Sequence, residues 1–121
     1  MSIRSFLGRH NNPMLRRLAA LVTSLGIGSS AFGACNANYC QATISLLYVD
    51  AGAVYIQMTG GLSGLTNCTP DSGVYLTLPK TNANYSSLFA LLLLSKAQGS
   101  SIMIRTNDGS SGCTVAYITT S

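Results

Sequence analysis

The chain has 121 residues and a formal net charge of +4. Four of its seven basic residues lie within the first 17 positions, before an apolar run. From residue 34 onward, three basic residues balance three aspartates. The basic balance therefore belongs to the N-terminal segment. The rest of the chain lacks the basic groove that single-stranded nucleic acid requires, so we predict no nucleic-acid partner.

Residues 1–33 have the three parts of a bacterial export signal. The basic residues of the signal are Arg4, Arg9, Arg16 and Arg17. An apolar run from Leu18 to Ile27 follows, and then the small-residue site Ala31-Phe32-Gly33. We expect initiation at Met1 or Met14 and a mature chain that spans 34–121. The apolar run is well short of the ~20 residues that span a bilayer, so we predict a secreted or periplasmic protein without a transmembrane anchor.

Four cysteines follow the expected cleavage site, and an even number in a short exported chain normally forms disulfides. They are Cys35, Cys40, Cys68 and Cys113. Three pairings are possible, and we favour a small loop between the first two with a long-range link between the last two. A zinc site competes with this prediction, but residues 34–121 contain no histidine, so we predict no metal and no cofactor. Lipid attachment at Cys35 is the other alternative.

Hydrophobic patterns predict three strands in the first half of the mature chain. Thr43 to Asp50 is rich in β-branched and aromatic residues, and Ala53 to Thr59 alternates between apolar and polar side chains. These two segments predict a hairpin. A third alternating segment runs from Gly73 to Leu78 and ends at Pro79.

The second half predicts one helix and two strands. Asn84 is a candidate N-cap, apolar residues recur after it at helical spacing, and Gly99 follows the last of them. Ser101 to Thr106 and Cys113 to Thr120 are the last expected strands, and the turn Asn107-Asp108-Gly109 separates them.

The predicted fold is mainly β with one helix, in the order β-β-β-α-β-β. This is the element order of the OB-fold, a five-stranded Greek-key barrel whose helix lies between strands three and four. We therefore expect one OB-fold-like, disulfide-containing domain at 34–121. A domain of this size has a marginal core, so its cross-links matter.

Two stretches carry a resemblance beyond the element order: Asn36 to Cys40 leading into Ile44 to Val49, and Ser87 to Gly99 leading into Ile102 to Arg105. In these the chain resembles the OB-fold B subunits of bacterial AB5 toxins, of the subtilase cytotoxin, typhoid and pertussis group. It also resembles short secreted bacterial proteins of the same outline. The resemblance implies a non-enzymatic, lectin-like ring that binds sialylated or other host glycans.

The resemblance also implies one site residue, because Tyr39 matches an aromatic position beside a sugar-contacting serine of those subunits. Cys40 stands where those subunits have a serine that contacts the sugar acid. The segment between the last two strands is shorter here, and the chain contains no tryptophan.

A second candidate site comes from strand parity. Tyr55 and Tyr75 fall on the polar side of the second and third strands, the face with which OB-folds commonly bind ligands. With Gln57 and Thr77 beside them, they are candidates for stacking on sugar rings and for bonding hydroxyl groups. Cross-strand packing of the tyrosines is the alternative interpretation.

The mature chain has little of the chemistry that catalysis needs. It contains no histidine and no glutamate, and its three aspartates lie in separate loops. Asp50 and Asp108 occur in turns, where aspartate often caps the local backbone. We predict a secreted non-enzymatic binding protein of the glycan-binding toxin-B-subunit type. The alternative is a structural or assembly protein of the cell envelope without a small-molecule ligand.

The predicted helix also indicates self-association. Its apolar residues cover more than the roughly 100° stripe that packing on one domain requires. They are Leu88, Phe89, Leu91, Leu92, Leu93 and Leu94. The apolar side chains that the domain does not bury need another partner, and a homo-oligomer is the simplest one.

Overall fold

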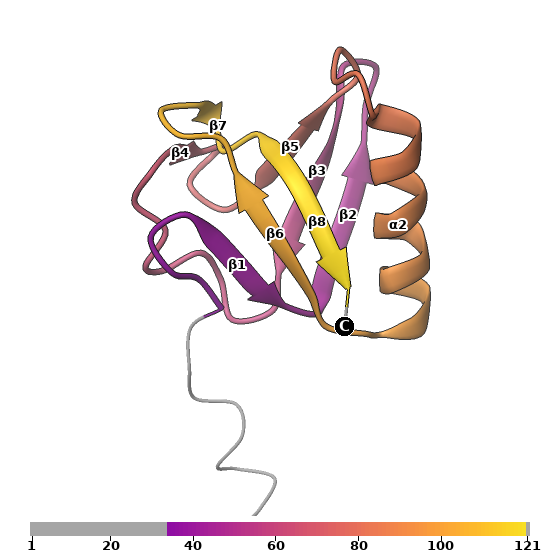
Figure 1. Cartoon of the computed structure of the whole chain (residues 1–121), viewed down its shortest axis with the longest axis horizontal. Helices are drawn as coiled ribbons and strands as arrows, with labels where there is room; N and C mark the ends of the chain where they lie inside the picture. Colours follow the sequence, from indigo (N-terminus) through magenta and orange to yellow (C-terminus); the bar gives the residue numbers. More distant parts are fainter. Residues whose placement is uncertain (1–33, 121) are drawn as a thin grey trace, which may run out of the picture. The chain divides into compact units, whose positions relative to one another are not determined.

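The computed structural model of the protein describes residues 34–120, so the expected signal segment lies outside the described residues. The described part is mainly β with one helix, as predicted (Figure 1). Its elements, in chain order, are β1 (Tyr39–Ala42), β2 (Ile44–Val49), β3 (Ala53–Met58), β4 (Thr69–Pro70), β5 (Leu76–Pro79), α2 (Tyr85–Gln98), β6 (Ile102–Thr106), β7 (Ser111–Gly112) and β8 (Val115–Thr120).

The strands form two antiparallel sheets and one short parallel pair. The first sheet has the order β1-β6-β8, the second has the order β2-β3-β5, and β4 pairs with β7 (Figure 1). Only Thr43 separates β1 from β2, so one stretch of chain contributes a strand to each large sheet. At the other side, the sheets meet in a single parallel bridge between Thr77 and Thr114. None of the three sheets closes into a barrel.

The strands differ from the sequence prediction in number and in position. β1, β4 and β7 were not predicted, because two to four residues are too few to show an alternating pattern. The third predicted strand was placed too early, since β5 begins only at Leu76. Asp71 and Tyr75 pair across a tight turn in which Ser72 and Gly73 have positive φ. Val74 therefore lies in that turn and is exposed, where alternation had placed it in the core.

The core lies between the two sheets and the helix. It consists of residues that alternate with partly buried ones along β3, β5 and β6, together with one side of α2. Its buried members are Cys40, Ile44, Val54, Ile56, Met58, Leu76, Leu78, Leu92, Ile102, Ile104, Cys113 and Val115. The alternation is what the period of two in a strand predicts when one face is buried.

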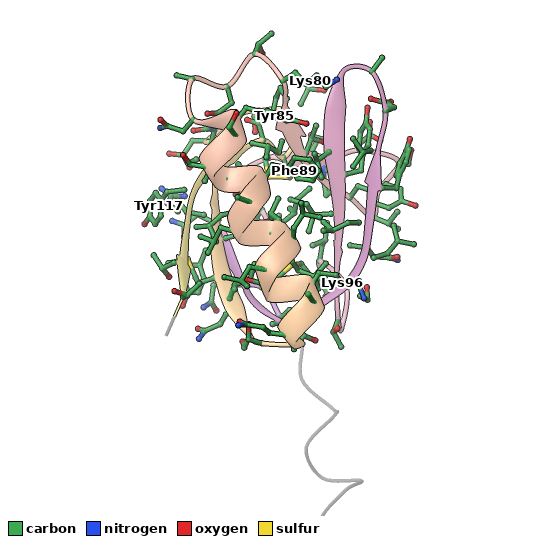
Figure 2. All side chains as sticks on the ribbon, turned by 90° about the vertical axis from the view of Figure 1, so that its right-hand side faces the viewer. Lys80, Tyr85, Phe89, Lys96 and Tyr117 are labelled. Atoms are coloured by element: carbon green, nitrogen blue, oxygen red, sulfur yellow. A yellow bond between two sulfur atoms is a disulfide. The ribbon has the colours of Figure 1, made fainter. Side chains whose placement is uncertain are left out.

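The helix prediction is confirmed at both ends. Asn84 is the N-cap residue, although its side chain makes no capping hydrogen bond. At the other end Gly99 adopts the left-handed conformation, φ 64°, that glycine reaches without steric cost. Tyr85 and Phe89 lie one turn apart on α2 (Figure 2) and pack against the core, with ring centroids 5.7 Å apart.

The favoured disulfide pairing is also confirmed. Cys35 is bonded to Cys40, and Cys68 is bonded to Cys113. The sulfur of Cys35 is therefore engaged in the structure, which argues against the alternative of lipid attachment there. Within residues 34–120, no helix has the length and the apolar character needed to cross a membrane.

We expect the two disulfides to differ in their contribution to stability. The Cys68–Cys113 bond closes a loop of 45 residues and the Cys35–Cys40 bond closes one of 5. Loop-closure entropy then gives losses of about 4 kcal/mol for Cys68→Ser and about 2 kcal/mol for Cys35→Ser. Urea unfolding of the two variants measures this difference. Each variant leaves its buried partner, Cys113 or Cys40, as a thiol, so the two are matched; equal losses would contradict the entropic account.

Candidate functional site

Three tyrosines gather on the outer face of the β2-β3-β5 sheet. The rings of Tyr48 and Tyr55 are stacked, with centroids 4.6 Å apart and an interplanar angle of 17°. Tyr75 presents an edge to both, at 5.8 Å from Tyr48 and 6.1 Å from Tyr55. These are favoured geometries for aromatic groups.

Strand register explains why the three rings meet. Tyr48 lies directly opposite Tyr55 in the β2-β3 hairpin, and Tyr55 lies opposite Thr77 of β5. Tyr75 precedes Thr77 by two residues, so its side chain points to the same face and lies diagonal to Tyr55. A register shift between Ile44 and Leu46 brings Leu46 opposite Gln57. The pairing of Tyr48 with Tyr55 depends on this shift. We call Leu46, Tyr48, Tyr55, Gln57 and Tyr75 the tyrosine face.

The structure bears on where the predicted residues lie, and it shows the cross-strand packing of tyrosines that was the alternative interpretation. The sequence prediction placed Tyr55, Gln57 and Tyr75 on one face, and the structure brings them together there. It missed Tyr48, which is 45% exposed and is the most accessible ring of the three. Counting back across the hairpin from its turn at Asp50 would have found Tyr48 opposite Tyr55.

Two predicted site residues, Thr77 and Tyr39, are not accessible members of the tyrosine face. The Oγ1 atom of Thr77 is buried, makes no hydrogen bond within the described part of the chain, and would lie 3.0 Å from a Cβ placed on Gly112. Tyr39 lies in β1, in the other sheet, opposite Arg105. It has no aromatic neighbour among residues 34–120, and the structure does not bring it to the three stacked rings.

Two carboxylates flank the tyrosine face. Asp50 occupies the tip of the β2-β3 hairpin, where its Oδ1 accepts hydrogen bonds from the backbone N–H groups of Gly52, at 2.8 Å, and Ala53, at 3.0 Å. These two bonds hold the pKa of Asp50 below its usual range. Asp71 lies directly opposite Tyr75, with backbone hydrogen bonds in both directions.

The electrostatics of Tyr55 confirm that both carboxylates are near. Partial burial raises the pKa of the Tyr55 hydroxyl, and the charge of Asp50 raises it further. Asp71 contributes in the same direction. Tyr55 therefore stays protonated at neutral pH and can donate a hydrogen bond.

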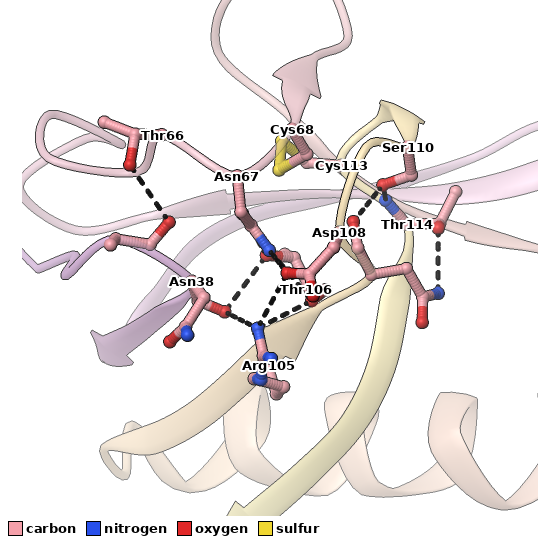
Figure 3. A network of polar contacts seen from close by, with 12 residues as sticks. Asn38, Thr66, Asn67, Cys68, Arg105, Thr106, Asp108, Ser110, Cys113 and Thr114 are labelled. Atoms are coloured by element: carbon pink, nitrogen blue, oxygen red, sulfur yellow. Dashed lines mark hydrogen bonds and ion pairs between the residues drawn. A yellow bond between two sulfur atoms is a disulfide. The ribbon is translucent and has the colours of Figure 1, made fainter.

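A separate polar network joins three loops beside the Cys68–Cys113 disulfide (Figure 3). The Asn67 amide donates to the Thr106 carbonyl oxygen, at 3.1 Å, and to Oδ1 of Asp108, at 2.9 Å, while its own oxygen accepts from the Thr106 hydroxyl. Arg105 donates to the carbonyl oxygen of Asn38 and lies 3.5 Å from Asp108. These hydrogen bonds tie the loops to one another, and the Asp108 side chain at their edge remains 75% exposed.

Two of the three aspartates, Asp50 at the hairpin tip and Asp108 in the network, make hydrogen bonds that hold the local structure. As predicted for turns, Asp50 caps backbone N–H groups. Asp108 accepts from Asn67, and this bond together with the Arg105 charge lowers the pKa of Asp108. Among residues 34–120, no three His, Cys, Asp or Glu side chains gather where they could hold a metal ion.

A shallow hollow of about 280 Å³ lies at the start of α2. It is lined by polar side chains and backbone of Lys80 and residues 82–87. None of the three stacked tyrosines lines it, so the hollow and the tyrosine face are distinct features. No known protein family, no curated protein and no solved structure matches the chain.

We expect Thr77→Val to raise stability by about 1 kcal/mol. The substitution replaces a buried hydroxyl that has no partner with a methyl group of similar size, which removes a desolvation cost. Valine also suits a strand. The free energy of urea unfolding checks this result. Thr77→Ser is the matched control, because it keeps the orphaned hydroxyl, and it should not stabilise the protein; a stabilised serine variant would show that the hydroxyl is not the cause.

Proposed function

We propose that the chain is an exported, non-enzymatic carbohydrate-binding protein with an OB-fold-like barrel, which acts as a homo-oligomer. The observation that carries this proposal is the exposed, mutually packed set of tyrosines on the outer face of the β2-β3-β5 sheet. Export is supported by the signal pattern of residues 1–33 and by the two disulfides.

The strand neighbours support the OB-fold assignment. If β1 and β2 are taken as one bent strand, each strand of the two large sheets has a neighbour on both sides. Followed from neighbour to neighbour, the strands form the path β2-β3-β5-β8-β6-β1. In this path the Thr77–Thr114 bridge supplies the contact of β5 with the start of β8. The helix also follows the third strand of this path, as in an OB-fold.

The composition of the tyrosine face supports carbohydrate as the ligand. Tyrosine rings offer flat apolar surface for the C–H face of a sugar, and their hydroxyls offer hydrogen bonds to the sugar's own hydroxyls. Gln57 adds an amide on the same face, and the flanking carboxylates are acceptors for sugar hydroxyls. The face also lies on a rigid sheet, so little freedom is lost when a ligand binds.

The helix supports self-association with a second copy of the chain. One side of α2 packs on the core through Tyr85, Leu88, Phe89 and Leu92. Leu93 and Leu94 point the other way and are 50% and 53% exposed. The exposed side continues with Ala90 and Ala97, which lie one turn before and one turn after them. Apolar side chains of this size on a helix surface are typical of an interface.

We expect glycan binding to depend on Tyr48. On a glycan array probed with the exported protein, Tyr48→Ala should weaken binding about tenfold, because it removes the most exposed ring of the stack. Binding should be weak per subunit and strengthened by multivalency. Tyr117→Ala is the matched control: Tyr117 is 49% exposed but lies on β8 of the other sheet (Figure 2), so its loss should change nothing.

Silence of the wild-type protein across the array would remove the carbohydrate proposal and favour a structural role in the cell envelope. Binding that is equally weakened by both tyrosine variants would remove the tyrosine face as the site.

We expect light scattering of the wild-type protein, recovered from the periplasm or medium with its N-terminus near Ala34, to give the mass of an oligomer. A Leu93→Ser and Leu94→Ser double variant should be monomeric and folded, because both side chains are exposed in the single chain. Tyr117→Ser, which removes an equally exposed side chain elsewhere, should remain oligomeric. A wild-type monomer at about 100 μM would contradict self-association.

A further inference from the structure

The charges around the tyrosine face are mostly negative. Asp50 lies at the hairpin tip, two residues after Tyr48, and Asp71 lies opposite Tyr75 at the other side of the cluster. Cross-strand partners project to the same side of a sheet, so the Asp71 side chain shares the face of Tyr75. The rings therefore lie between two carboxylates.

Few cations are available to balance them. Among residues 34–120, Lys80 is the only basic residue close to this region: its backbone N–H donates to the Gly52 carbonyl oxygen at the hairpin tip, and its charge acts on Asp50. Lys96 is near the other end of α2 (Figure 2), and Arg105 is engaged with Asp108 in the loop network. Two carboxylates and one ammonium group leave the surroundings of the face with an excess of negative charge.

We propose that the tyrosine face selects neutral or amine-bearing sugars and rejects acidic ones, so that sialylated, uronate and sulfated glycans are excluded. This inference rests on the proposed carbohydrate function and departs from the sialylated ligands that the toxin resemblance implies. An acidic sugar stacked on Tyr48 would bring its carboxylate or sulfate close to Asp50 or Asp71. Nearby like charges repel even in water, and the single arginine of residues 34–120, Arg105, is engaged with Asp108 instead.

The two carboxylates can also attract a ligand, because they are hydrogen-bond acceptors. The two Asp50 bonds to the hairpin backbone both go to Oδ1, and neither of these N–H groups occupies Oδ2. A carboxylate oxygen accepts a hydrogen bond from a sugar hydroxyl and accepts a stronger, charge-assisted one from an amine. The order of preference is therefore amine-bearing first, neutral second and acidic last.

The test uses exported protein and pairs of immobilised glycans that are identical except for one carboxylate or sulfate group. In low-salt buffer the neutral member of each pair should bind about fivefold more tightly than its acidic counterpart, and this advantage should shrink at about 0.5 M salt. The double variant Asp50→Asn, Asp71→Asn should lose most of the discrimination, because asparagine keeps the hydrogen-bond acceptor and removes the charge. Asp108→Asn, which removes a carboxylate that is not on this face, should keep it.

The outcomes separate the two proposals. Acidic members that bind as tightly as, or more tightly than, their neutral counterparts, through contacts that Tyr48→Ala still abolishes, would overturn the selectivity and leave the carbohydrate site in place. Discrimination that survives the double Asp variant would overturn the role of Asp50 and Asp71. Absence of binding to every glycan would remove the carbohydrate function and this inference with it.

Discussion

The connection between the two sheets depends on a few contacts around Cys113. Its sulfur is bonded to Cys68, and its carbonyl oxygen accepts a hydrogen bond from the backbone N–H of Thr77 in β5. Cys113 is fully buried and has a positive φ of 45°, which is unusual for a residue other than glycine. The preceding Gly112 has a φ of 86°, which favours glycine, and a Cβ placed there would crowd the Thr77 side chain at 3.0 Å. These constraints bring β5 beside β8, and so the core is covered on that side.

The loops around Cys113 and the tyrosine face differ in how their side chains are engaged. The loops around Cys68 and Cys113 have satisfied polar groups, a disulfide and close backbone approaches, all of which favour a single rigid arrangement. The tyrosine face, by contrast, has its side chains on a regular sheet and leaves aromatic surface in contact with solvent. Its exposure in a chain with a small core is therefore the feature that most needs a functional explanation.

Much of this fold could be predicted from the sequence because its strands and helix follow simple periods. Alternation identified β3, helical spacing with a terminal glycine identified α2, and cysteine spacing gave both disulfides. The positions of Val74 and Thr77 could not be predicted, because alternation says which side of a strand a residue faces and not where the strand begins or what lies above it. β1 was missed for a related reason: its pairing is with β6, more than sixty positions later, and short-range patterns contain no such information. The site was predicted only where parity alone decides, at Tyr55, Gln57 and Tyr75.

The bent stretch formed by β1 and β2 has a consequence for the order in which the protein acquires its structure. The strands of the β2-β3-β5 sheet all lie between residues 44 and 79 and are close together in the sequence, so this sheet can form as soon as residue 79 is available. The β1-β6-β8 sheet joins the first strand of the domain to the last and must wait for Thr120. A chain that crosses a membrane N-terminus first would therefore remain incompletely folded until its whole length had passed. Under the proposed export, a channel that accepts only unfolded chains would meet no closed domain until Thr120 had passed.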